Sequence, residues 1–145
     1  MPDLSLADYR ALAEFRYQIR AFLHFSEEQA RAHGVEPQQH QLLLAVRGLP
    51  EGTSATVGEL ALRLQLKHHT TVELIDRLEA RAAVTRTPST HDRRQVIVAL
   101  TPGGRALLRS LSLTHREEIE RTAPALLRAL KPLLPSARKH KTEVA

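Results

Sequence analysis

The sequence predicts a mainly α-helical domain that carries one small antiparallel β hairpin. Two observations predict this fold class. Apolar residues recur at intervals of three and four over most of the chain, and serine, threonine or proline stands where most of these stretches begin. Between residues 84 and 100 the pattern changes to two β-branched runs around a polar loop, which is typical of paired strands.

The composition is that of a globular protein. The 145 residues suit one domain, of which 42% are hydrophobic and 26% charged. The chain has no cysteine, which excludes disulfide scaffolds, thiolate catalysis and cysteine-ligated zinc. No apolar run approaches the roughly 20 residues of a membrane span, and the N-terminus lacks the pattern of a secretion signal. We therefore expect a cytoplasmic protein without a membrane partner.

The chain is basic, with a formal net charge of +5. Arginine supplies this charge, since 17 arginines stand beside only 4 lysines. A basic balance favours a polyanionic partner such as nucleic acid. A codon bias toward arginine explains the ratio of arginine to lysine equally well. The positions of the arginines must therefore distinguish the two explanations.

The first predicted helix is long. Ser5 can cap it, with Asp8 three residues on as an approximate capping box, and Gly34 ends it. About 28 residues without proline or glycine lie between these ends, and they make a helix of roughly 42 Å. That length exceeds the width of a small domain and predicts a helix that is shared with a partner.

Three shorter helices follow. Pro37 begins the first, which residues 48–52 interrupt, and Thr56 caps the second. The third is predicted from His69 to Arg81 and has two faces. The inner face carries Thr71, Val72, Ile75 and Leu78, and the opposite face carries His69, Thr70, Glu73, Asp76, Arg77 and Ala80. Two closely joined short helices, the second with a wide polar face, are typical of a helix-turn-helix.

A predicted hairpin comes next, followed by two helices. The β-branched runs 84–87 and 95–100 flank a polar, basic loop, and a hairpin directly after a helix-turn-helix makes a winged helix. Thr101 and Pro102 then begin a long helix, and Thr122 and Pro124 are predicted to begin a separate last one. The tail, residues 136–145, is basic, and we expect it to fray.

Four motifs occur in a set order: Thr56-Val57-Gly58-Glu59-Leu60-Ala61, Thr71-Val72-Glu73-Leu74-Ile75-Asp76-Arg77-Leu78-Glu79, Asp92-Arg93-Arg94 and Leu100-Thr101-Pro102-x-Gly104. Each motif is weak by itself. In this order and spacing, the sequence resembles the MarR family of bacterial transcription regulators over nearly its whole length. The resemblance implies a homodimer in which residues 1–35 and 101–145 form a helical dimerisation region. Residues 36–100 would form a winged helix-turn-helix DNA-binding domain.

The sequence departs from the family at one turn. Family members usually carry glycine after the recognition helix, where this chain has Ala82 and Ala83. If the backbone there is left-handed, alanine costs on the order of 1 kcal/mol.

The polar face of the third short helix predicts contacts to base edges. Arginine can pair with guanine through two hydrogen bonds, and threonine can contact a thymine methyl group. A docked recognition helix points its N-terminus at the major groove. The candidate DNA-binding residues of this region are Lys67, His68, His69, Thr70, Thr71, Glu73 and Arg77. The alternative is a solvated helix face with a Glu73–Arg77 ion pair.

The predicted wing adds Arg86, Arg93 and Arg94 as candidate DNA-binding residues. An arginine on a narrow projection suits the minor groove, where A·T stretches concentrate negative potential. The resemblance implies this role for Arg94, which matches the arginine of the family's Asp-x-Arg motif. It also implies that Asp92 braces the wing by ion pairing. The alternative is a solvated turn with one weak ion pair.

The five aromatic residues all lie in the first predicted helix: Tyr9, Phe15, Tyr17, Phe22 and Phe25. Basic residues are interleaved with them. A planar organic acid needs rings to stack on and a guanidinium for its carboxylate. The candidate effector-binding residues are therefore Arg16, Tyr17, Arg20 and His24. The resemblance implies such ligands in the crevice between the dimerisation and DNA-binding domains, and the alternative is that the aromatic residues form only dimer core.

The sequence thus predicts a sequence-specific DNA-binding regulator, a ligand-relieved repressor that acts as a homodimer on a pseudo-palindromic operator. No cofactor is predicted beyond a candidate small aromatic acid effector. An enzyme is not predicted, because the sequence has neither a glycine-rich phosphate loop nor a Gly-x-Ser-x-Gly elbow. The eight histidines show no metal-ligating spacing. The alternatives are an effector-independent DNA-architectural or accessory protein and a metal-responsive regulator.

Overall fold

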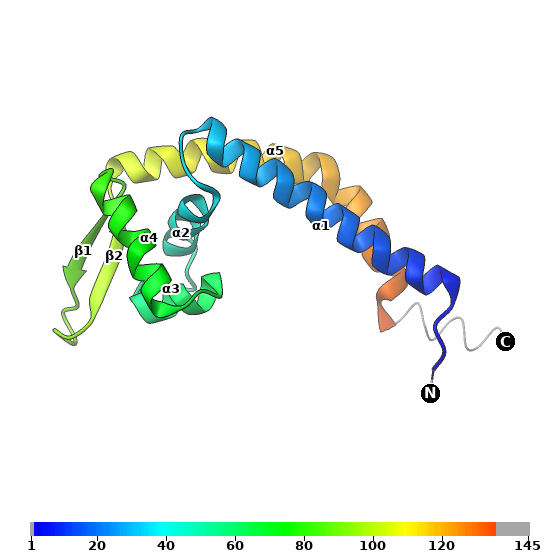
Figure 1. Ribbon diagram of the computed structural model, residues 1–145, viewed down its shortest axis with the longest axis horizontal. Coiled ribbons are helices and arrows are strands. Elements are labelled where there is room, and N and C mark those ends of the chain that lie inside the picture. The colour runs from blue at the N-terminus through cyan, green and yellow to red at the C-terminus, as the bar shows by residue number, and fades with distance from the viewer. Residues whose placement is uncertain (1, 136–145) are drawn as a thin grey trace. The chain divides into compact units, whose positions relative to one another are not determined.

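The computed structural model describes residues 2–135 and confirms the predicted mainly α fold with a small antiparallel wing. Its elements are α1 (Leu6–Ala32), α2 (Pro37–Arg47), α3 (Val57–Leu64), α4 (His68–Ala80), β1 (Val84–Pro88), β2 (Val96–Leu100), α5 (Pro102–Leu130) and a 3-10 turn, Lys131–Leu133 (Figure 1). The predicted basic tail, residues 136–145, lies outside the described residues.

Contacts divide the chain into two units. Among the described residues, the helical unit contains 2–28 and 114–135, and the winged unit contains 29–113. These boundaries fall inside α1 and α5, so each of these helices runs from one unit into the other. The predicted assignment of residues 1–35 and 101–145 to dimerisation, and of residues 36–100 to DNA binding, stays a prediction.

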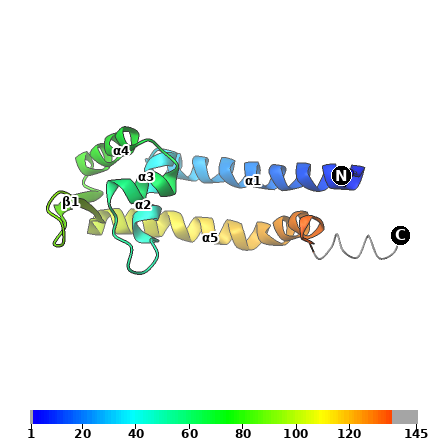
Figure 2. The ribbon, with the colours of Figure 1, turned by 90° about the horizontal axis from the view of Figure 1, so that it is seen from below.

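In the helical unit, α1 and α5 run side by side in opposite directions (Figure 2). A buried histidine of α5, His115, lies between them: its Nε2 is 2.8 Å from Ser26 Oγ of α1. The rings of Phe22 and Phe25 meet the His115 ring at steep angles, with centroids 6.1 and 5.6 Å away. Two of the five aromatic residues therefore pack inside the unit itself.

The predicted start and end of α1 are confirmed. The Ser5 hydroxyl accepts a hydrogen bond from the Asp8 N–H at 3.2 Å, and the Asp8 carboxylate accepts the Ser5 N–H at 2.9 Å, which is a reciprocal cap. At the other end Gly34 adopts a left-handed φ of 77°, and the Val35 N–H donates to the Ala30 carbonyl. This turn satisfies a carbonyl that the helix end would otherwise leave unpaired.

The core of the winged unit lies where α2, α3, α4 and the hairpin meet. Its fully buried side chains include Leu42, Leu43, Leu60, Ile75, Leu78, Val84 and Val98. β1 and β2 pair in register from Val84 opposite Leu100 to Pro88 opposite Val96. The Val98 N–H donates to the Ala55 carbonyl at 2.9 Å, so the loop after α2 lies along the other edge of β2.

The predicted break before the last helix is wrong. α5 continues through Thr122 and Pro124 to Leu130 as one helix of 29 residues. Proline removes one helical hydrogen bond and leaves the carbonyl of the residue four positions earlier without its donor. Pro124 and Glu120 are both exposed, so water can bond that carbonyl and the helix need not end. The sequence pattern at Thr122 and Pro124 resembles a helix start, and it does not show that Pro124 lies on the exposed side of a continuous helix.

The turn after α4 is left-handed, with φ of 58° at Ala82. The Ala82 N–H donates to the Glu79 carbonyl and the Ala83 N–H to the Leu78 carbonyl, both at 2.9 Å, which completes a Schellman cap. The backbone therefore has the conformation that usually requires the family's glycine, and alanine occupies it at a cost. The first turn of α5 approaches closely, because the Thr101 hydroxyl donates to the Ala82 carbonyl at 2.6 Å.

Replacing Ala82 by glycine should therefore stabilise the protein. We expect the free energy of unfolding to rise by about 1 kcal/mol, because glycine adopts positive φ without the clash of a Cβ atom. Urea denaturation followed by circular dichroism measures this change. Ala80→Gly is the matched control, since Ala80 is exposed and helical, and the same substitution there should cost roughly 0.5–1 kcal/mol. Destabilisation in both variants would contradict a strained Ala82.

Candidate nucleic-acid interface

α3 and α4 form the predicted helix-turn-helix. The Thr56 hydroxyl caps α3 by accepting the Glu59 N–H at 3.1 Å, as predicted. α3 ends at Gln65 in a left-handed conformation, with φ of 54°, and α4 begins three residues later. α4 turns Leu74, Ile75 and Leu78 into the core. Its opposite face is therefore free to meet a partner.

The exposed face of α4 carries most of the predicted DNA-binding residues. Lys67, His68, His69, Glu73 and Arg77 are exposed, and Thr70 is half-buried. The alternative Glu73–Arg77 ion pair is not among the ion pairs of residues 2–135. The guanidinium of Arg77 therefore remains available to a partner.

Thr71 does not belong to this face, which corrects the prediction that it binds DNA. The residue is fully buried, and its hydroxyl donates to the Lys67 carbonyl at 3.0 Å. Threonine can occupy a helix core because the carbonyl one turn earlier satisfies its hydroxyl. The helical periodicity already places Thr71 in the apolar sector, and this signal outweighs its polar side chain.

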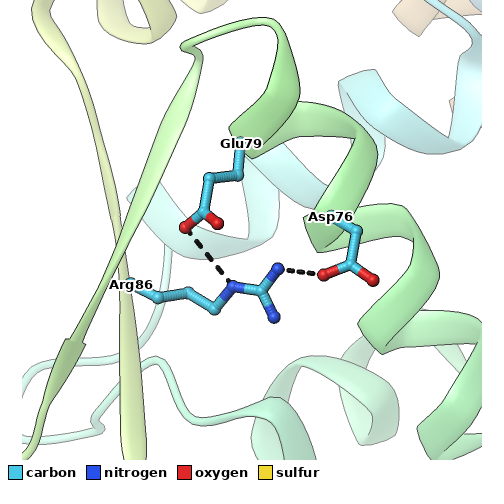
Figure 3. A network of polar contacts seen from close by, with 3 residues as sticks. All are labelled: Asp76, Glu79 and Arg86. Carbon is cyan, nitrogen blue, oxygen red and sulfur yellow. Dashed lines mark hydrogen bonds and ion pairs between the residues drawn. The ribbon is translucent and has the colours of Figure 1, made fainter.

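Arg86 of β1 reaches toward α4 (Figure 3). From β1, its Nη2 donates to Asp76 Oδ1 of α4, and its Nε lies 3.4 Å from Glu79 Oε2. The hydrogen bond with Asp76 raises the pKa of Arg86, and the negative charges of both carboxylates raise it further against the opposing effect of burial. This geometry argues against the predicted DNA contact, because two carboxylates already hold the guanidinium. Arg86 instead neutralises acidic groups on the exposed side of α4 and ties β1 to that helix.

The wing tip presents the remaining candidates. Arg93 and Arg94 are exposed. Asp92 braces the tip differently from the prediction: its Oδ1 accepts the backbone N–H of Arg94 at 3.0 Å, and within residues 2–135 it forms no ion pair. The Ser89 hydroxyl accepts the N–H groups of His91 and Asp92. The turn thus holds the backbone, and the Arg94 side chain is left free.

The sequence does not predict the hydrogen bonds that Arg81 makes at the end of α4. Arg81 Nη1 donates to the Gly34 carbonyl at 2.9 Å and to Gln39 Oε1 at 3.2 Å. It thereby fixes the C-terminal end of α4 to the turn between α1 and α2. The partners lie more than 40 residues away in the sequence, so helical periodicity cannot indicate them.

The candidate effector residues divide into two sets on α1. Arg16 and Arg20 line a groove of about 470 Å³ together with Leu12, Phe15, Ile19 and Leu23. Tyr17 and His24 lie about 20° apart around the helix and outside this lining. Tyr17 is 63% exposed, and His24 Nε2 lies 2.9 Å from Glu28 Oε1. The structure therefore brings the two arginines together with an apolar stripe, while Tyr17 and His24 stand beside it.

The MarR family model matches residues 33–95, from the turn before α2 through the wing loop. This match agrees with the MarR resemblance of the sequence. Members of the MarR family are transcription regulators. Comparison with curated protein sequences gives no significant match.

Solved structures share the fold of this chain, and one of them, AbsC, is a MarR-family transcriptional regulator. AbsC from Streptomyces coelicolor is 21% identical, with a TM-score of 0.70, and the match covers 96% of this chain and 99% of AbsC. A point mutant of MepR from Staphylococcus aureus, bound to an oligodeoxyribonucleotide, is 18% identical with a TM-score of 0.63, over 99% of this chain and 100% of MepR. BpsR from Bordetella bronchiseptica, whose DNA binding is regulated by 6-hydroxynicotinic acid, is 22% identical with a TM-score of 0.58, over 89% of this chain and 85% of BpsR.

Two further features of residues 2–135 bear on other kinds of site. No group of three or more histidine, aspartate or glutamate side chains is placed to hold a metal ion in this part of the chain. No helix within it is long and apolar enough to cross a membrane.

Proposed function

We propose that this protein is a MarR-family, sequence-specific DNA-binding transcription regulator that acts in the cytoplasm. The observation that carries the proposal is the exposed polar face of α4, which includes Arg77, beside a wing whose tip presents Arg93 and Arg94. Such a helix fits the major groove, and such a tip fits the minor groove. MepR, a relative of the same fold, is solved with an oligodeoxyribonucleotide. Selection of binding sites from random duplexes tests the proposal, and an unenriched pool would contradict it.

The proposed regulator is a homodimer. Of the thirteen large hydrophobic side chains exposed in residues 2–135, ten belong to the helical unit. They are Leu4, Leu6, Tyr9, Leu12, Tyr17, Ile19, Leu23, Ile119, Leu127 and Leu134. A concentration of this kind on one unit is typical of a surface that a partner covers. A second copy of the chain offers the same surface, which is what a twofold interface needs.

Leu127→Glu should convert the dimer to a monomer. Leu127 is 65% exposed, so the substitution should leave the single chain folded. A twofold interface loses the leucine twice, at about 1.5–3 kcal/mol each, so the dissociation constant should rise at least about 100-fold. Sedimentation velocity across a dilution series measures this change. Leu62→Glu is the matched control, because Leu62 is 69% exposed on α3 in the winged unit. An unchanged Leu127→Glu dimer would remove this surface from the interface.

The proposed operator is a pseudo-palindrome. Two recognition helices related by a twofold axis enter successive major grooves about 34 Å apart, so half-site centres should lie roughly 10 base pairs apart. At saturation one dimer should bind each selected duplex, which sedimentation of the complex reads directly.

The proposed regulator is a repressor that a small aromatic acid releases from DNA. The α1 groove supports this proposal, because it combines an apolar stripe with the guanidinium groups of Arg16 and Arg20. The aromatic acid that regulates DNA binding by BpsR supports the ligand class. A hundredfold loss of operator affinity requires roughly 2.7 kcal/mol of coupling, which lies in the usual allosteric range.

Arg20→Ala should weaken binding of an aromatic carboxylate about tenfold and leave ligand-free DNA binding unchanged, because it removes a charge-assisted hydrogen bond to the ligand only. Thermal shift and operator titration with 6-hydroxynicotinic acid and substituted benzoic acids measure both effects. Arg116→Ala is the control for charge, since Arg116 is 72% exposed on α5. If no acid in the panel changes either readout, the groove is dimer core and the protein is effector-independent.

A further inference from the structure

Two adjoining cavities of the winged unit share a pair of arginines. The first, of about 430 Å³, lies between the α2–α3 loop and β2, and Arg47 and Arg105 line it. The second, of about 350 Å³, extends along α5, where the same two arginines are joined by Arg109 and Ser112. The two cavities share the guanidinium groups of Arg47 and Arg105, the second adds that of Arg109, and together they are called the groove below.

The charge of this groove is not balanced by the protein. Within residues 2–135, none of Arg47, Arg105 and Arg109 forms an ion pair. Glu51 is the one carboxylate that lines either cavity in this part of the chain. Arg105 and Arg109 stand one turn apart on α5, and like charges at this spacing repel. The groove retains an excess of positive charge that a bound anion would neutralise.

A hydrogen bond restrains the side chain of Arg105, which lines both cavities. Its Nη1 donates to the Leu100 carbonyl at 3.0 Å, which restrains the guanidinium at the end of β2. An arginine has five N–H donors, so the others remain for a partner. Apolar side chains of Ala55, Val98 and Leu100 line the same cavity. Restrained hydrogen-bond donors beside apolar side chains are typical of a small-molecule site.

We propose that this groove binds a small oxyanion with at least two negative charges, either a phosphate ester or a polycarboxylate. Three guanidinium groups and one carboxylate leave two positive charges for the ligand to neutralise, and guanidinium pairs with carboxylate or phosphate through paired hydrogen bonds. The volumes match a metabolite, since ligand cavities usually measure about 300–1,000 Å³. The site lies in the winged unit alone, so it needs neither a second subunit nor the α1 groove.

Isothermal titration of the full chain with pyrophosphate and with citrate, at a constant ionic strength of about 0.15 M, tests the proposal and distinguishes the two ligand classes. We expect one of them to bind once per chain with a dissociation constant below about 1 mM. Arg105→Gln and Arg109→Gln should each weaken that binding about tenfold or more, and Arg116→Gln should change it by less than about twofold. Thermal melting without ligand confirms that each variant is folded, and Arg109→Gln tests the site without removing the Leu100 hydrogen bond.

Several outcomes would overturn the proposal. Equal weakening in Arg116→Gln would mean that the whole basic chain, and not the groove, attracts the anion. Failure of both anions to bind would leave the groove without this function. If Arg109→Gln weakens duplex binding as strongly as anion binding, the arginines belong to the DNA interface instead. The first two results do not depend on the proposed regulator function, because the anion titration contains no DNA.

Discussion

Gly104→Ala is expected to lower the free energy of unfolding by about 3 kcal/mol or more, because α5 begins almost in contact with the turn after α4. A Cβ atom at residue 104 would lie 2.0 Å from the Ala83 carbonyl oxygen and 3.0 Å from its carbon. The obstacle is backbone, which cannot rotate away as a side chain can. The Thr101 N–H also donates to that same carbonyl at 3.0 Å, so a shift would break the contact that joins α5 to α4.

Gly103→Ala is the matched control for this loss. A Cβ atom there meets the Thr101 hydroxyl at 3.8 Å and the Ala82 carbonyl at 4.0 Å, which are ordinary contacts. Its unfolding free energy should stay unchanged or rise by up to about 1 kcal/mol, since alanine favours helix. Thermal melting should separate the variants by roughly 6–12 °C. Equal melting temperatures would mean that α5 does not approach Ala83 this closely in solution.

Arg94→Ala is expected to weaken binding to a selected operator by about 1–3 kcal/mol while leaving the fold intact. The side chain projects from an exposed wing tip whose backbone Asp92 and Ser89 hold, so its removal disturbs no packing. The lost charge should also reduce the dependence of affinity on salt by about one phosphate contact. Fluorescence anisotropy at several salt concentrations measures both changes.

Two further variants should be compared with Arg94→Ala. Arg116→Ala removes the same charge from the helical unit and should leave operator affinity nearly unchanged. Arg77→Ala should relax the preference for the operator over random DNA and leave non-specific binding largely as it was, because Arg77 lies on the exposed face of α4. An Arg94→Ala protein with full affinity at moderate salt would exclude the wing tip from DNA binding.

Much of this architecture follows from local patterns in the sequence. The Ser5–Asp8 cap, the Thr56 cap and the 3.6-residue periodicity of α4 depend on residues within one or two helical turns. The change to β-branched runs likewise locates the hairpin within a residue or two. Such signals act over short distances along the chain, so a sequence contains them completely. They determined the order of the elements up to the start of α5, the exposed face of α4 and the family resemblance.

Contacts between distant residues decided the rest. Arg86 is basic and lies on a wing strand, which predicts a DNA contact, yet Asp76 and Glu79 hold its guanidinium. Pro124 continues a helix because its exposed side lets water satisfy the backbone, and Gly104 is required because Ala83 lies against it. A sequence states which groups are charged, restricted or small, but their effect depends on the neighbours that folding brings to them. Only the tertiary structure supplies those neighbours.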